Sequence, residues 1–90
     1  MPYRIDHPDA LEQYLKNNGF GINERGGIKF ISVGDIVVAR LYPLSHDPQH
    51  PDPSKVDYYL DFFPQARIKK VSEQVKKLID YVNPVPGCLV

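Results

Sequence analysis

The spacing of apolar positions along the chain predicts two helices. From residue 65 to residue 82, apolar side chains recur every three or four positions between charged and polar ones, as on an amphipathic helix. A shorter helix is expected to begin at Asp6, which can cap its first turn, with Pro8 tolerated there because it has no N–H to leave unpaired. Asn18 and Gly19 are expected to end this helix, since glycine readily adopts the left-handed conformation.

Three further segments have the pattern of strands. Residues 28–33 and 36–42 are rich in β-forming side chains. Gly34 and Asp35 between them fit the two-residue turn of a β-hairpin. Residues 57–63 alternate between two faces, which predicts the third strand. The glycine-rich stretch 21–27 is expected to be a connector.

The order helix, strand, strand, strand, helix predicts an α+β fold. We expect a two-layer sandwich in which both helices cover one face of a three-stranded antiparallel meander. Residues 43–53 contain four prolines, so a long extended loop is expected before the third strand. The ninety residues are expected to form a single small domain, 1–90, with 83–90 as a C-terminal tail.

The predicted sheet has apolar residues on both faces. If Val37, Ala39 and Leu41 point toward the helices, the other face is more apolar than a face in contact with water should be. Tyrosine and arginine among aliphatic side chains are typical of the centres of protein interfaces. The expected partner-binding residues are Ile36, Val38, Arg40, Tyr42, Tyr59 and Phe63.

Two kinds of cover fit this face equally well. One is a protein partner, which includes a second copy of the chain in a homodimer. The other is the proline-rich loop or the C-terminal tail of the same chain, folded over the sheet as a small second core.

The proline-rich loop also contains two histidines and two aspartates within seven residues. His46 and His50 have the spacing of a metal site on a helix, but the prolines forbid a helix there. We therefore expect neither a metal site nor a cofactor, and we place His46 and His50 at the rim of the partner-binding surface. A metal-responsive regulator built on this loop is the third hypothesis for function.

The net charge is zero, which removes the simplest argument for a nucleic-acid or membrane partner. The charges are nevertheless separated, because segment 43–63 has four acidic residues against one basic, and helix 65–82 has five basic against two acidic. Nucleic-acid binding through this helix is the alternative function, although any amphipathic helix needs a polar outer face. Its phosphate-binding residues would be Arg67, Lys69, Lys70, Lys76 and Lys77.

No catalytic arrangement emerges from the sequence, so an enzyme is not expected. Cys88 lies in the tail without a neighbouring histidine, and Asp57 and Asp61 are about 13 Å apart along a strand, which is too far for a carboxylate pair. A single cysteine permits no internal disulfide, and no segment resembles a signal peptide or a membrane span. These features predict a cytoplasmic location.

The sequence therefore predicts a small cytoplasmic protein-binding module, such as an adaptor, a regulatory subunit or an inhibitor. It would act through the apolar and aromatic sheet face and the proline-rich loop. Its partner would be another protein or a second copy, with nucleic acid as the less favoured alternative and no membrane partner.

Overall fold

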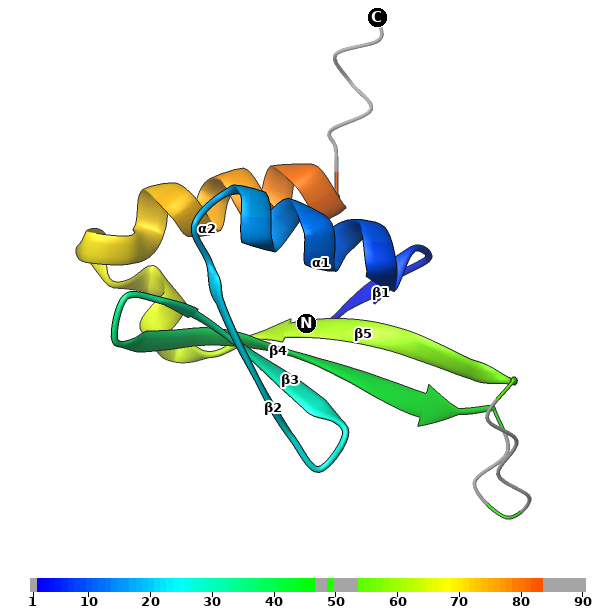
Figure 1. Ribbon diagram of the computed structural model, residues 1–90. Helices are drawn as coiled ribbons and strands as arrows, with labels where there is room; N and C mark the ends of the chain where they lie inside the picture. The colour runs from blue at the N-terminus through cyan, green and yellow to red at the C-terminus, as the bar shows by residue number, and fades with distance from the viewer. Residues whose placement is uncertain (1, 47–48, 50–53, 84–90) are drawn as a thin grey trace, which may run out of the picture.

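The computed structural model describes residues 2–46, 49 and 54–83, which form a sheet with both α-helices on one face (Figure 1). The α+β class expected from the sequence is therefore confirmed. In chain order the elements are β1 (Tyr3–Ile5), α1 (Pro8–Asn17), β2 (Gly21–Arg25), β3 (Ile28–Val33), β4 (Ile36–Ser45), β5 (Val56–Phe62), the 3₁₀ helix η1 (Pro64–Arg67) and α2 (Lys69–Val82).

The sheet has five antiparallel strands in the order β1-β5-β4-β3-β2, so the expectation of three strands was wrong. β1 and β2 are the two additional strands, one at each edge. The predicted connector 21–27 is mostly β2, and Gly26 and Gly27 form the tight turn to β3. Their φ angles of 59° and 82° fit a hairpin turn that needs positive φ at both central positions.

The helices differ from prediction at their starts. α1 begins at Pro8 with His7 as its N-cap, rather than at Asp6, and it ends before Gly19, whose φ is 79°. The expected continuous helix over 65–82 is interrupted. η1 ends at Arg67, and Ile68 is extended, with ψ of 132°, before α2 begins.

β4 continues into the segment predicted to be a loop. Pro43 lies in this strand beside Tyr58 of β5. β3 pairs with β4 only as far as Leu41, so at Pro43 the strand has a free edge where a missing N–H is tolerated. Most of the remaining loop, including His50, and the tail residues 84–90 lie outside the described residues.

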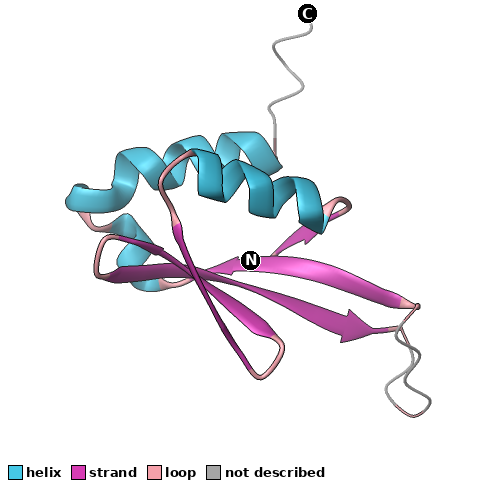
Figure 2. Cartoon of the chain, viewed as in Figure 1, coloured by secondary structure: helices cyan, strands magenta, loops and turns pink. Residues whose placement is uncertain are grey.

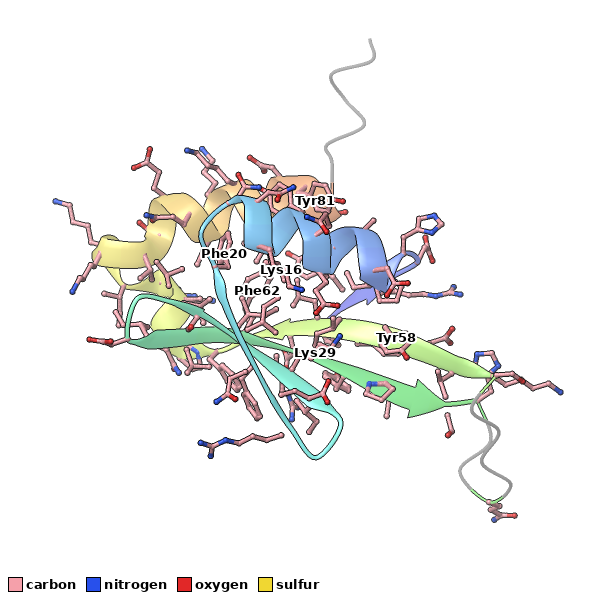
Figure 3. All side chains as sticks on the ribbon, in the orientation of Figure 1. Lys16, Phe20, Lys29, Tyr58, Phe62 and Tyr81 are labelled. Carbon is pink, nitrogen blue, oxygen red and sulfur yellow. The ribbon has the colours of Figure 1, made fainter. Side chains whose placement is uncertain are left out.

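The core lies between the sheet and the helical layer (Figure 2). The apolar stripe of each helix faces the sheet, and Phe62 lies in the space between the two layers (Figure 3). Removing each such side chain from water stabilises the fold by about 1.5–3 kcal/mol. The largest fully buried side chains are Leu11, Leu15, Ile31, Val38, Leu60, Val71 and Leu78.

A β-bulge in β4 changes which of its side chains are buried. Ala39 lies opposite Ile31 and Val37 lies opposite Ser32, which leaves Val38 as the extra residue. Val38 and Ala39 are consequently both fully buried, whereas Val37 is 37 % exposed.

The bulge overturns two of the predicted partner-binding positions. Val38 belongs to the core, and Ile36 packs against the core from the end of β4. Strict alternation along 36–42, on which the prediction rested, does not hold in this strand, and Val37 points away from the helices instead.

Candidate binding surface

The outer face of the sheet is the face turned away from α1 and α2. Leu41 and Leu60 point into the core, and successive side chains of a strand alternate between its two faces. Arg40 and Tyr42 of β4 and Tyr59 of β5 therefore lie on the outer face. The structure thus brings together three of the predicted partner-binding residues.

Tyr42 and Tyr59 form the centre of this face. They are direct cross-strand partners, with ring centroids 6.1 Å apart and an interplanar angle of 30°. The guanidinium carbon of Arg40 lies 4.7 Å from the centre of the Tyr42 ring, within the range of a cation–π contact. The result is an aromatic surface with a cation held at its side.

Phe30 extends this surface onto β3, where it is the cross-strand partner of Arg40. It was not among the predicted site residues. The alternation around buried Ile31 was the available signal, because it places Phe30 on the opposite face. We call Phe30, Arg40, Tyr42 and Tyr59 the aromatic cluster.

Arg40 has incomplete hydrogen bonding. Its Nη2 lies 3.6 Å from Oδ2 of Asp61, the only ion pair that Arg40 makes within the described residues. Its Nε is buried and has no acceptor among those residues. The Arg40 side chain is nevertheless 39 % exposed, so the rest of its guanidinium can donate to an acceptor on a partner.

Phe63 is not part of the aromatic cluster. β5 ends at Phe62, and the N–H of Phe63 donates to the carbonyl of Val38 at 2.9 Å before the chain turns into η1. Phe63 instead lines a cleft that is bordered by β1, the end of β5, η1 and α2.

At the far end of β4, the predicted rim residue His46 contacts Asp57. Its Nε2 lies 3.1 Å from Oδ2 of Asp57, and Arg4 donates to Oδ1 of the same carboxylate at 3.4 Å. Asp57 therefore joins the rim to β1. Over 2–46, 49 and 54–83, no three histidine, cysteine, aspartate or glutamate side chains gather where they could hold a metal ion.

Most of the basic residues of the alternative hypothesis lie in the helical layer. Four lysines belong to α2, on the face of the sheet opposite to the aromatic cluster, and Arg67 belongs to η1, which leads from β5 to α2 (Figure 1). All five are exposed, and within the part of the chain that is described none makes an ion pair. The four lysines are Lys69, Lys70, Lys76 and Lys77.

Comparison with protein-family models, with curated proteins and with solved structures finds no match to this chain. Within the described ranges, no helix has the length and apolar character needed to cross a membrane. Function is therefore inferred from the chemistry of the surfaces themselves.

Proposed function

We propose that this chain is a protein-binding module whose contact surface is the outer face of the sheet. The observation that carries the proposal is the aromatic cluster, in which two tyrosines and an arginine lie together on the face opposite both α-helices. Tyrosine and arginine are the side chains most often found at the energetic centres of protein interfaces, together with tryptophan. Val37, 37 % exposed, and Leu44, 51 % exposed, add apolar area on the same face.

The charges around the cluster favour a protein over a nucleic acid on this face. Asp57 and Asp61 lie two positions to either side of Tyr59 on the same side of β5. Each carboxylate is paired with an arginine of the same face, Asp57 with Arg4 and Asp61 with Arg40, so these arginines are less available to phosphates. A protein surface with charges of both signs is compatible with this mixed pattern.

The expected partner segment combines two chemical features. It carries an apolar or aromatic side chain that packs on Tyr42 and Tyr59, and a carboxylate or carbonyl oxygen that accepts from Arg40. Arginine binds such oxygens through several N–H groups in a fixed geometry, which gives directional selectivity. A second copy of the chain can supply the same groups, because the outer face contains both aromatic rings and carboxylates.

Selection from a library of displayed random peptides tests the proposal. Peptides selected on the native chain should combine acidic and apolar residues and lose at least tenfold in affinity on Tyr42→Ser, as expected for a central interface residue. Tyr81→Ser, which removes an exposed tyrosine from the helical layer, is the matched control and should leave binding unchanged. Sedimentation of the native chain and of Tyr42→Ser tests the second-copy version in parallel.

Two results would contradict the proposal. In the first, the selected peptides still bind the double variant Tyr42→Ser with Tyr59→Ser. In the second, the selection enriches no peptide and the native chain also sediments as a monomer at high concentration. Thermal melting of each variant establishes that a loss of binding is not a loss of fold.

A second candidate is nucleic-acid binding through α2 and η1. It is favoured by the five exposed cations described above, which the chain's own carboxylates leave unpaired in the described residues. It predicts a gel shift with duplex RNA or DNA that weakens steeply with salt. Absence of a shift at low salt would exclude it.

A further inference from the structure

An open cleft of about 590 Å³ lies between α2 and the β1–β5 edge of the sheet. It is on the helical side of the sheet, so it is separate from the aromatic cluster. Its volume falls within the range of about 300–1,000 Å³ that is typical of sites for small molecules.

The cleft lies beside the break in the helix that the sequence predicts. After Phe62 the backbone forms η1, and the extended residue Ile68 then redirects it into α2. η1 and Ile68 therefore lie between the end of β5 and the start of α2. On the other side of the cleft, β1 is a short edge strand of only three residues.

The walls of the cleft are mainly apolar. Tyr3 and Phe62 form one side, with their rings edge to face and centroids 5.9 Å apart. Val75 and Ile79 line it from α2, on the side of that helix opposite to the contact with α1. These side chains can bury a hydrocarbon body of a ligand.

Two cations, Arg67 and Lys76, also line the cleft, and no acidic residue does. Both are exposed, and neither makes an ion pair with another described residue. The hollow beside β2 differs, because an acidic side chain, Asp35, lines it together with Arg25. The cleft therefore combines apolar walls with an uncompensated positive charge.

We propose that this cleft binds a small amphipathic carboxylate. The hydrocarbon part of the ligand lies against Tyr3, Phe62 and Ile79, and its carboxylate pairs with Arg67 and Lys76. Each part alone gains less than the whole, because a neutral hydrocarbon has no attraction to the two cations and an inorganic anion leaves the apolar walls in water.

Titration of the full chain with sodium octanoate, followed by two-dimensional NMR, tests the proposal. Octanoate should shift the methyl resonances of Val75 and Ile79 in a saturable manner. 1-Octanol, which has the chain without the charge, and inorganic phosphate, which has charge without the chain, should each bind at least about fivefold more weakly. Equal binding of octanoate and 1-octanol would overturn the proposal, as would shifts with octanoate confined to residues outside the cleft.

Charge variants locate the carboxylate. Arg67→Gln with Lys76→Gln should weaken octanoate binding by about fivefold or more. Lys69→Gln with Lys77→Gln changes the net charge of the same region equally but involves no residue of the cleft, so it should leave the affinity unchanged. Equal losses in the two double variants would mean that octanoate senses only the general positive charge of α2, and this would contradict the proposal.

A blocking variant locates the hydrocarbon part. Ser72 is exposed and lines the cleft, so Ser72→Phe should fill part of it without disturbing the core and abolish the octanoate-dependent methyl shifts. Gln74→Phe places the same ring on an exposed position of α2 outside the cleft and is the matched control. Unchanged octanoate binding by Ser72→Phe would contradict the proposed position.

Discussion

Lys29 of β3 donates a hydrogen bond from Nζ to Oε2 of Glu12 on α1, at 3.0 Å, and so joins the sheet to the helical layer (Figure 3). Lys16, one turn further along α1, lies 3.6 Å from the other oxygen of the same carboxylate. The hydrogen bond from Lys29 is the main reason why the pKa of Glu12 lies below its ordinary value of 4.5. The same bond raises the pKa of Lys29 above 10.5.

Replacement of Glu12 by glutamine should lower the free energy of unfolding by about 0.5–1 kcal/mol at neutral pH. The effect depends on pH because the folded chain holds the carboxylate charged more strongly than the unfolded chain does. As pH falls below 4.5, the unfolded chain takes up this proton first, so the stabilisation is lost. As pH rises above 10.5, the unfolded chain releases the Lys29 proton first, with the same result.

Chemical unfolding of the native chain and of Glu12→Gln across this pH range measures the difference. Glu73→Gln is the control, since Glu73 is an exposed acid of α2 with no ion pair to another described residue. A stability difference that stays constant from neutral pH to well below 4.5 would show that Glu12 acts through packing rather than charge.

Neighbouring valines of β4 should respond very differently to truncation. Val38→Ala leaves a cavity at a fully buried position and should destabilise the fold by about 2 kcal/mol. Val37→Ala removes the same atoms from a position 37 % exposed and should cost less than about 1 kcal/mol. Urea unfolding of both variants checks the bulge directly, and a reversed order of the two costs would indicate regular alternation along β4.

The two helices are joined by a stack of Tyr14 on Tyr81, with ring centroids 4.0 Å apart and an interplanar angle of 19°. Tyr81→Ala should lower stability by about 1 kcal/mol, because stacked aromatic pairs contribute roughly that amount beyond their buried area. Tyr81→Phe keeps the ring and should retain most of the stability. Thermal melting distinguishes the two, and equal losses in both variants would assign the effect to the hydroxyl group.

The turn between β3 and β4 needs a residue that adopts positive φ. Gly34 has a φ of 59°, and no atom lies within 4 Å of the Cβ that a substitution would add. The cost of Gly34→Ala is therefore purely conformational and should be about 1–2 kcal/mol. Gly34→Asn should cost less, since asparagine tolerates this region better, and equal melting temperatures of the two variants would contradict this explanation.

Features with a local origin could be predicted from the sequence. The limits of β3 coincide with the expected run 28–33, and the end of α1 coincides with the stop signal before Gly19. In both places the signal is local: the β-forming residues themselves make up the strand, and the glycine that ends the helix directly follows it. The tyrosines of the outer face were likewise found, because regular alternation holds at Tyr42 and across β5.

Features that depend on distant contacts were missed. β2 has only Ile22 directed toward the core, so its polar sequence gave no strand signal, and β1 is too short to show a period. The bulge at Val38 shifts the register between two strands without any change in composition. The break at Ile68 is hidden because apolar spacing continues across it from η1 into α2.

The position of β1 has a consequence for the order of folding. β2, β3, β4 and β5 pair between consecutive strands, whereas β1 pairs with β5, which is distant in the sequence, as Tyr3 does with Leu60. Closing so long a loop costs more entropy than forming the consecutive hairpins. The four consecutive strands can therefore assemble first, and docking of β1 completes both the sheet and the wall of the cleft that Tyr3 provides.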